Sequence, residues 1–362
     1  MIDATPATRE AIVRDNVNIR VTNPLADDQW DSLVARHPRA SVFHRRGWLE
    51  ALARTYGYEP FVLTSSPSDG PLENGIVFCR VASWVTGTRL VSIPFADHCE
   101  PLLDYEAAFP AFIDWLRGEF QRRGYSYIEL RPLTPLGRTS CDLRASCSYC
   151  LHSLDLKPTL EQIFEGLHKD SIQRKIQRAE REKLSYEGGV SGELVREFYQ
   201  LLLMTRRRHH LPPQPRTWFE NLVECMGDSI QIRLARKEGT PIAAIVTLSH
   251  RSTIVYKYGC SDARFHNLGG MPFLFWRLIE ESKALGVRDI DFGRSDLENE
   301  SLITFKDRFG AKKRTLTYYR HVGKKVHELL DRRDSWVFRR VVSILPDVLL
   351  SATGRILYKH TG

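Results

Sequence analysis

The sequence predicts an α/β protein built from two copies of one unit. A pattern of helix, glycine and strand occurs twice, once ending in Gly124 to Leu130 and once in Gly286 to Phe292. A tryptophan inside a predicted helix also occurs in both halves, as Trp48 and as Trp218. These paired features favour duplication of one large unit over a short repeat array. The alternative is a chance likeness, because helix-glycine-strand units are common.

Length and composition agree with two domains. The chain has 362 residues, 42% of them hydrophobic and 27% charged, which is enough to bury two cores. No run reaches the roughly 18 uncharged apolar residues of a membrane span. Residues 1–20 lack the apolar part of a signal peptide, so the expected location is the cytoplasm. Seven cysteines, an odd number in a long chain, favour reduced thiols over a disulfide framework.

Hydrophobic periodicity and breaker residues place the elements. The expected parts are a loose tail at 1–16, a first domain at 17–160, a second domain at 161–325 and an amphipathic helical tail at 326–362. In the first domain, strands are expected at 17–22, 60–64, 75–81, 89–94 and 125–131, and helices at 24–37, 41–56 and 106–123. In the second domain, helices are expected at 168–183, 218–226 and 271–285, and strands at 230–236, 241–249 and 253–259.

The two copies differ where the last of these strands ends. The first copy continues as Arg131-Pro132-Leu133, a plain exit from a strand. The second continues as Asp291-Phe292-Gly293-Arg294-Ser295, and a polar insert then leads to Phe305-Lys306-Asp307-Arg308-Phe309-Gly310. Glycine, arginine and serine in place of a hairpin turn predict an opened strand end. The second half is therefore expected to carry the functional site, and a strand with a solvated loop is the alternative.

This segment resembles the signature of FemAB-type peptidyl and aminoacyl transferases, especially the branch found beside exosortase and exopolysaccharide genes. The basic stretch Ser171 to Ala179 and the stretch Ser41 to Trp48 fit the same family. The resemblance spans residues 17–320, and its specific motifs lie in the second half. It implies two tandem acetyltransferase-like (GNAT-like) α/β domains, including a BioF2-like acetyltransferase domain. The chain departs from the family at Leu52, where a lysine is associated with the diphosphate of muropeptide precursors, which argues against a standard cell-wall precursor.

Acyl transfer to an amine passes through a tetrahedral oxyanion and needs a donor group near that oxygen, but no covalent intermediate. The resemblance points to Lys306 for this contact, with Phe305 and Phe309 on either side as substrate contacts. The alternative is a surface lysine whose stem lies along two core aromatics.

Other residues near Lys306 are expected to bind the substrate or to support catalysis. Asp291 is expected to orient a cation or to accept the proton of the attacking amine through water. As the counterpart of Glu129 it can instead be structural. Arg294 and Ser295 offer hydrogen-bond donors to a phosphate or a carbonyl.

The resemblance also implies an acceptor site. In the family, the region that corresponds to residues 205–215 borders the acceptor pocket, so Arg206 and His210 are expected to bind the substrate. Tyr258, in the strand expected at 253–259, is the third predicted contact.

The donor is expected at the start of the helix predicted at 271–285. The backbone amides of Gly269 and Gly270 stand at its N-terminus, where an anion is favoured. Acetyltransferases hold the pyrophosphate of coenzyme A on an Arg/Gln-x-x-Gly-x-Gly/Ala loop, of which Arg264 to Gly270 is a distorted version. The donor therefore stays open between acyl-coenzyme A and aminoacyl-tRNA, each as a co-substrate, and no tightly bound cofactor is expected.

The net charge of +8 suits anionic partners such as phosphate-bearing donors, tRNA, sugar nucleotides or a membrane surface. A solubilising surface is the alternative. In the predicted helix 168–183, Arg174, Arg178 and Arg181 lie opposite an apolar face, which favours either phosphate binding or a solvated helix face. The tail at 335–358 alternates apolar clusters with arginines, so it is expected to dock on the first domain or on an anionic membrane.

Several other classes of site are excluded by pattern. Four candidate zinc ligands lack the paired spacing of a zinc site, so no metal is expected; they are Cys141, Cys147, Cys150 and His152. Hydrolase, kinase and metalloprotease motifs of the Gly-x-Ser-x-Gly, Walker and His-Glu-x-x-His types are absent from the sequence.

These observations together predict an N-acyltransferase that works by direct attack of an acceptor amine on an activated acyl donor. The acceptor is expected to be an amino sugar, a peptide or a lipid-linked precursor in cell-envelope, peptidoglycan or exopolysaccharide biosynthesis. A lipid-linked acceptor would place the protein at the inner face of the membrane. The alternatives are an acetyl-coenzyme A-dependent amino-sugar acetyltransferase and a non-catalytic RNA-binding or scaffold module that keeps the fold.

Overall fold

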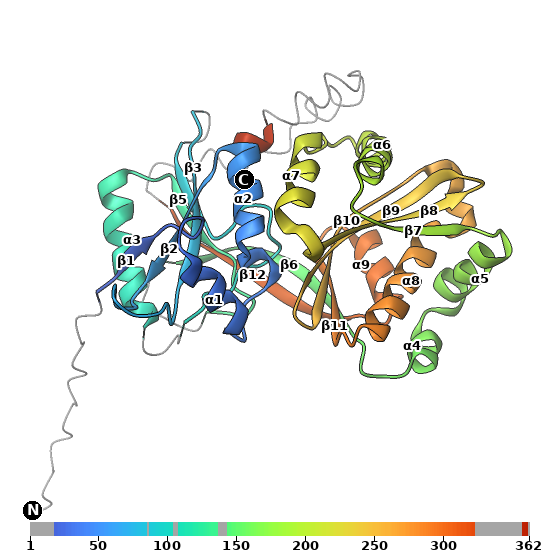
Figure 1. Cartoon of the computed structure of the whole chain (residues 1–362), viewed down its shortest axis with the longest axis horizontal. Coiled ribbons are helices and arrows are strands. Elements are labelled where there is room, and N and C mark those ends of the chain that lie inside the picture. The colour runs from blue at the N-terminus through green and yellow to red at the C-terminus, as the bar shows by residue number, and fades with distance from the viewer. Residues whose placement is uncertain (1–17, 85–86, 104–107, 137–142, 323–356, 361–362) are drawn as a thin grey trace, which may run out of the picture.

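The computed structural model describes residues 18–84, 87–103, 108–136, 143–322 and 357–360. The predicted tail at 1–16 and most of the one at 326–362 lie outside these residues. Figure 1 shows two lobes side by side, each with its own helices packed on its own part of a sheet. In the part of the chain that the structure describes, none of the helices is long and apolar enough to cross a membrane.

The first lobe is formed by the N-terminal part of the chain. Its elements are β1 (Arg20–Thr22), α1 (Asp28–Arg36), the short 3-10 helix η1 (Val42–His44), α2 (Arg46–Tyr56), β2 (Glu59–Thr64), β3 (Ile76–Val81), β4 (Arg89–Val91), α3 (Phe109–Arg123) and β5 (Tyr127–Leu130).

The second lobe is formed mainly by the elements that follow, of which β6 and β12 also reach the first lobe. Its first elements are β6 (Arg144–Asp155), α4 (Leu160–Gly166), the π-helical turn η2 (Lys169–Gln173), α5 (Arg174–Arg181), β7 (Ser185–Gly189), α6 (Gly192–Arg208), α7 (Arg216–Met226), η3 (Gly227–Ser229) and β8 (Ile230–Lys237). They are followed by β9 (Thr240–His250), β10 (Thr253–Ser261), η4 (Ala263–Leu268), α8 (Gly270–Ala284), β11 (Asp289–Asp296), α9 (Glu300–Asp307) and β12 (Lys312–Val322).

Among the described residues, twelve strands form one mixed sheet in the order β1-β2-β3-β4-β5-β12-β6-β11-β10-β9-β8-β7. The two halves of this order have the same pattern. In the first half β1 to β4 are antiparallel, β4 and β5 are parallel, and β12 is antiparallel to β5. In the second half β7 to β10 are antiparallel, β10 and β11 are parallel, and β6 is antiparallel to β11. Parallel neighbours need a crossover, which is α3 in the first half and α8 in the second. Gly124 and Gly286 follow these helices with φ of 65° and 71°. The predicted duplication of one α/β unit is confirmed.

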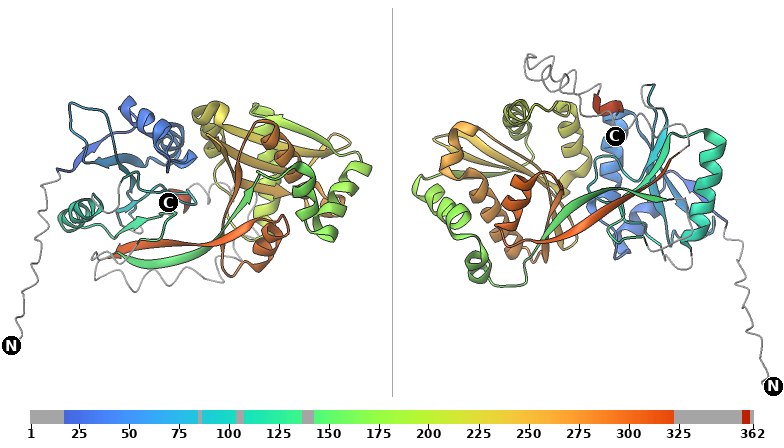
Figure 2. Two further views of the ribbon diagram at one scale, coloured as in Figure 1. Left: turned by 90° about the horizontal axis from the view of Figure 1, so that it is seen from below. Right: turned by 180° about the vertical axis from the view of Figure 1, so that it is seen from behind.

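The sixth strand of each half comes from the other half of the sequence. β6 follows β5 in the chain but pairs with β11, and β12 follows β11 but pairs with β5. β6 and β12 also pair with each other, and Figure 2 shows these two long strands running together across both lobes. The domain limits at 17–160 and 161–325 follow the order of the chain and stay a prediction. In the sheet, this exchange of strands joins the two halves.

Several predicted boundaries in the first half move for local reasons. The helix expected at 24–37 begins at Asp28, because Asp27 caps it by accepting a hydrogen bond from Gln29 N. The helix expected from Ser41 is divided, since Ser41 precedes the short helix η1 and α2 begins only at Arg46. Capping and the short 3-10 turn are thus the local features that set these boundaries.

The second half differs from expectation at four helices, two of which, α4 and α9, are not among the predicted elements. The helix expected at 168–183 starts with the π-helical turn η2, and only residues 174–181 are α-helical. Its apolar face is nevertheless buried as the spacing predicts, with Ile176 and Ala179 1% and 0% exposed. Helix α6 is also missing from the predicted elements, although Ser191 caps it by accepting a hydrogen bond from Leu194 N.

The two halves meet through the equivalent helices α2 and α7. Trp48 on α2 and Trp218 on α7 are fully buried, and their ring centroids lie 5.3 Å apart in an edge-to-face arrangement. Gly47 permits this contact, because a Cβ at this position would lie 2.2 Å from the carbonyl oxygen of Cys225. We call this contact region between the two halves the seam.

We predict that Gly47→Ala lowers the free energy of unfolding by about 1–3 kcal/mol, because the added methyl group separates α2 from α7. Urea denaturation of the purified protein measures this change. Gly118→Ala is the matched control in α3, since nothing lies within 4 Å of a Cβ there. It should leave stability unchanged or raise it by up to about 1 kcal/mol through helix propensity. Equal stability of both variants would contradict the close approach.

Candidate active site

The sheet opens in its second half where β10 and β11 stop pairing. Their parallel register runs only from Thr253 and Asp289 to Val255 and Asp291. Beyond this point β10 stays with β9, and β11 stays with β6 as far as Asp296. The strand that was expected to end near Phe292 therefore continues, with an irregular register between Asp291 and Arg294 that changes the direction of its side chains.

Lys306 of α9 reaches into this opening. Its side chain is 2% exposed, and Nζ donates hydrogen bonds to the carbonyl oxygens of Gly293 at 2.8 Å and Arg294 at 3.2 Å. Burial lowers the pKa of Lys306 from 10.5 to about 8, although the charges of Asp97 and Asp291 act in the opposite direction. The interpretation of Lys306 as a surface lysine is therefore wrong.

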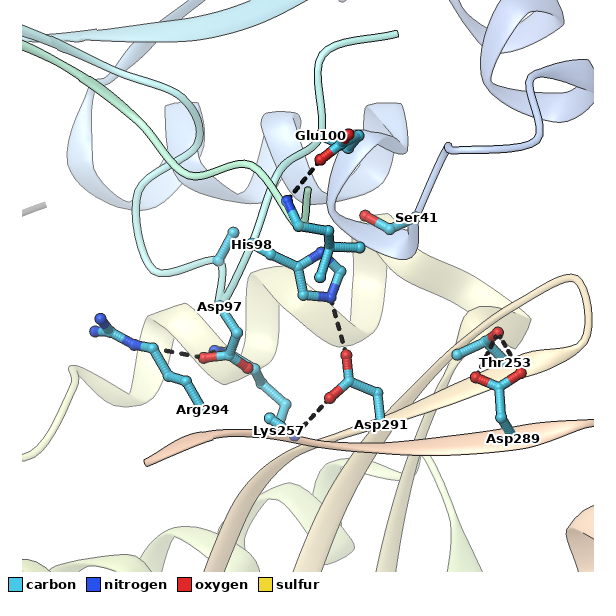
Figure 3. A network of polar contacts seen from close by, with 12 residues as sticks. Ser41, Asp97, His98, Glu100, Thr253, Lys257, Asp289, Asp291 and Arg294 are labelled. Atoms are coloured by element: carbon cyan, nitrogen blue, oxygen red, sulfur yellow. Dashed lines mark hydrogen bonds and ion pairs between the residues drawn. The ribbon is translucent and has the colours of Figure 1, made fainter. Parts of the chain in front are cut away.

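A loop of the first half brings two more ionisable groups to the same place (Figure 3). His98 Nε2 lies 2.9 Å from Asp291 Oδ2, and Asp97 Oδ1 lies 2.9 Å from Lys257 Nζ and 3.9 Å from Arg294 Nε. All three contacts cross the seam, because Asp97 and His98 belong to the first half and their partners to the second. We call these five residues and Lys306 the seam network.

Burial and pairing set the charge states in the seam network. Burial alone would raise the pKa of Asp291, but the hydrogen bond and the charge of His98 outweigh it and lower the pKa below its usual value. The backbone N–H of Gly293 donates to Asp291 Oδ1 at 2.7 Å and acts in the same direction. Burial lowers the pKa of Lys257, and Asp97 opposes this shift. Asp291 is thus an ionised carboxylate at neutral pH.

Two polar atoms of the seam network are buried without a hydrogen-bond partner among the described residues. They are Nδ1 of His98 and Nη1 of Arg294. Oγ of Ser295, the residue after Arg294, is also buried without a partner. The guanidinium carbon of Arg294 lies 4.0 Å from the ring centroid of Tyr149 and 5.2 Å from that of Tyr318. Most buried polar atoms in proteins have a hydrogen-bond partner, so three such atoms close together mark this region as unusual.

The predicted aromatic residues belong to an aromatic cluster beside Lys306. The ring centroids of Phe305 and Phe309 are 5.1 Å apart, and each ring packs on Phe275 of α8. Phe292 stacks on the same Phe275 ring at 5.2 Å. This cluster anchors α9 under β11 and so holds Lys306 in the opening.

A cavity of about 260 Å³ lies at the N-terminus of α8. It is lined by Ser171, Ile172, Lys175, Ile242, Ala243, Ser261, Phe265, His266, Gly270, Met271, Pro272, Phe305 and Arg308. The amides of Gly270 and Met271 precede the first intrahelical bond at this end, which Phe273 N donates to Gly269 O. Gly269 has φ of 80°, and a Cβ there would lie 2.4 Å from Lys175 O. Close packing of α5 on this loop therefore requires the glycine.

The structure separates the other predicted site residues from this cavity. Arg264 pairs with Asp262 at 2.6 Å, and its side chain is 75% exposed beside a different, open hollow. Arg206 donates to Gln214 Oε1 at 3.2 Å, and His210 is exposed. Contacts of Arg264, Arg206 and His210 with a ligand therefore stay a prediction. A ligand that binds them would have to extend to the outer surface of the protein.

Tyr258 lies closer to the seam network. Its hydroxyl accepts a hydrogen bond from Trp218 Nε1 at 2.9 Å, and Lys257 Nζ lies 5.8 Å from its ring centroid. Asp97, His98 and Lys257 are missing from the predicted site. A lysine in the apolar strand β10 is the sequence signal that points to Lys257, because lysine is rarely buried without a partner.

We predict that Gly293→Ala destabilises the fold by about 1–3 kcal/mol, because its φ of 69° disfavours a side chain and its Cβ would lie 2.9 Å from Asp97 Oδ2. Thermal and urea unfolding measure the loss. Gly286→Ala is the control, with φ of 71° and nothing within 4 Å of a Cβ. A loss no larger than that of the control would show that Asp97 does not press on β11.

Known proteins are similar to this chain at two levels, in the sequence of the second half and in the overall fold. Residues 168–306 match the family model of the acetyltransferase (GNAT) domain. FemX has a similar structure with a TM-score of 0.64 at 12% identity, covering 84% of this chain and 97% of that one. No curated protein sequence matches the chain.

Two further solved structures extend the likeness. L-PGS from Bacillus licheniformis has a TM-score of 0.52 at 13% identity, covering 90% of this chain and 95% of that one. A tandem GNAT protein from the clavulanic acid biosynthesis pathway has a TM-score of 0.51 at 13% identity, covering 84% and 98%. At these identities the likeness concerns the fold. The predicted fold class of two tandem GNAT-like units, and the resemblance to FemAB-type transferases, are confirmed at this level.

Proposed function

We propose that this chain, whose residues 168–306 match the GNAT acetyltransferase domain, is an N-acyltransferase that transfers an acyl or aminoacyl group to an acceptor amine. The observation that carries the proposal is the place of Lys306. Its buried ammonium group stands in the opening between β10 and β11, and its neighbour Phe305 lines the cavity at α8. A cation is thus fixed near the carboxylates of the seam, and its neighbour in sequence lines the cavity that we assign to the donor.

The cavity at α8 fits the anionic end of an acyl donor. The N-terminus of α8 favours negative charge, and the cations Lys175 and Arg308 line the same cavity. The apolar side chains of Ile242 and Ala243 in β9 line the same cavity, as does Phe305, the neighbour of Lys306 in sequence. Both an acyl-coenzyme A and the acylated end of a tRNA carry phosphate groups together with an acyl group.

The reaction follows from the groups in the opening. The acceptor nitrogen attacks the acyl carbonyl carbon, and the resulting oxyanion needs a hydrogen-bond donor in a site without water. Lys306 has three N–H donors, of which two contact Gly293 and Arg294. We assign the third to the oxyanion. When the intermediate collapses, the carbon–sulfur or carbon–oxygen bond to the donor breaks, and the proton lost by the amine ends on the leaving thiol or hydroxyl.

The acidic residues have different roles in this proposal. Both oxygens of Asp291 have partners, His98 and the N–H of Gly293, so Asp291 positions the imidazole and the irregular part of β11. Asp97 lies against Gly293, whose carbonyl holds Lys306. Its carboxylate is placed to attract the ammonium form of an acceptor and to receive its proton.

The acceptor that we propose is an amino sugar or another amine of cell-envelope or exopolysaccharide biosynthesis. This part rests on the resemblance stated above and on Leu52. Leu52 is fully buried in the core of the first half and provides no contact to a diphosphate. A muropeptide precursor is therefore not the acceptor that we favour.

We predict that Lys306→Ala lowers kcat about 10²–10³-fold, as removal of one oxyanion donor does, while donor affinity changes little. The assay follows release of free thiol from acetyl-coenzyme A with a panel of amino sugars and peptides, and release of tRNA from an aminoacyl-tRNA. Lys313→Ala is the control, since this lysine on β12 has a side chain that is 61% exposed. Full turnover in Lys306→Ala would contradict the role assigned to Lys306, whereas donor binding without any turnover by the wild-type protein would favour the scaffold alternative.

The contribution of Lys306 should depend on pH with a defined sign. Its pKa of about 8 means that the ammonium form, which stabilises the oxyanion, is present below pH 8 and is lost above it. The ratio of the wild-type rate to the Lys306→Ala rate should fall as the pH rises through this value. Taking the ratio removes the titration of the acceptor amine, which both proteins share. A ratio that is constant from pH 6 to pH 10 would contradict the assigned role.

The donor is identified by calorimetry with acetyl-coenzyme A, with charged tRNA and with uncharged tRNA. We predict that Lys175→Ala weakens binding of the true donor about tenfold through the loss of one phosphate contact. Lys169→Ala is the control, because Lys169 is exposed on the same segment and does not line the cavity. Equal affinity of both variants would place the donor phosphates elsewhere.

A further inference from the structure

Residues 357–360 lie across the seam, where Figure 1 shows them beside α2. Tyr58 OH donates to the carbonyl oxygen of Tyr358 at 2.6 Å, and Arg89 Nη2 donates to that of His360 at 2.8 Å. On the other side, the hydroxyl of Tyr358 donates to the carbonyl oxygen of Pro212 at 3.2 Å. The segment 357–360, which we call the strap, is thus bonded to both halves.

The ring of Tyr358 also enters the aromatic packing of the seam. It meets Phe95 with a centroid distance of 5.7 Å and an interplanar angle of 69°. Phe95 in turn packs on Tyr56 at 5.1 Å and on Trp218 at 6.0 Å. Edge-to-face contacts of this kind are specific in geometry, so the position of Phe95 depends on Tyr358.

Phe95 belongs to the loop that provides Asp97 and His98 to the seam network. Within this loop, Ile93 and Phe95 have φ of 58° and 60°, which is left-handed backbone that is unfavourable for residues with a branched or bulky side chain. Such a conformation persists only when its surroundings hold it. Tyr358 supplies part of that support from outside the loop. It does so through its contact with Phe95, which stands two residues before Asp97.

We propose that Tyr358 is a positioning residue, and that the strap fixes the loop 93–98 so that Asp97 and His98 meet Lys257 and Asp291. The strap also contacts Pro212, in the loop that follows the predicted acceptor contacts Arg206 and His210. It therefore fixes two loops, one of each half, on the acceptor side of the site. The effect on turnover rests on the proposed function, whereas the effect on the loop does not.

The loop itself is tested by hydrogen exchange on the full chain, followed by mass spectrometry. Tyr358→Ala should speed exchange in peptides that cover residues 92–99 about tenfold, because local opening becomes easier. Peptides that cover residues 262–272, at the start of α8, should not change. Tyr358→Phe keeps the ring and loses only the bond to Pro212, so it should restore most of the protection. Lys359→Ala changes an exposed neighbour and is the control.

Kinetics test the consequence for the site. Tyr358→Ala should raise the KM of the acceptor or lower kcat about tenfold through misplacement of Asp97, with no change in the calorimetric affinity for the donor. Tyr358→Phe should rescue most of this loss.

Three results would overturn the inference. These are unchanged exchange at residues 92–99, equal disturbance at residues 262–272, and a rise in turnover on loss of Tyr358, which would make the strap an inhibitory cover. If the wild-type protein transfers no acyl group, the proposed function fails, and the exchange result still decides whether Tyr358 holds the loop.

Discussion

Buried charge at the seam constrains the rest of this structure. Asp97 pairs with Lys257, and His98 with Asp291, in surroundings where all four side chains are at most 11% exposed. Removing one partner of a buried ion pair costs about 3–5 kcal/mol, because the other charge is left without compensation. The halves therefore keep one relative position, which fixes the loop 93–98 against the opening between β10 and β11. Loop, opening and donor cavity form one unit for this reason.

Differences between equivalent residues of the two copies show which copy carries the site. Glu129 of β5 and Asp291 of β11 occupy equivalent positions, but Glu129 is ion-paired with Arg131 and Arg320 and so has a structural environment. Asp291 instead meets His98, whose Nδ1 is buried without a partner in the described chain. The first half thus contributes a loop to the site, and the second half contributes the opening itself. Exchange of β6 and β12 holds both contributions on a single sheet.

Lys306 shows how one side chain can serve both the fold and the proposed chemistry. The carbonyls of Gly293 and Arg294 lie just beyond the point where β11 leaves β10, and buried carbonyls need a donor. Lys306 supplies it from α9, and the aromatic packing of Phe305 and Phe309 holds the helix in place. The same burial brings its pKa to about 8, so the ammonium group is held rigidly and is still mostly protonated at neutral pH.

The sequence by itself determined the duplicated α/β unit, most strands of the second half and the grouping of Asp291, Arg294 and Lys306, because periodicity and short motifs are local. Asp97 and His98 could not be predicted to join that group, since they stand nearly two hundred residues from Asp291 in sequence. The strand exchange and the contacts of Tyr358 were likewise decided only by the tertiary structure. Pairing of buried charges and close packing act between residues that are distant in sequence, and no local pattern records which partners meet.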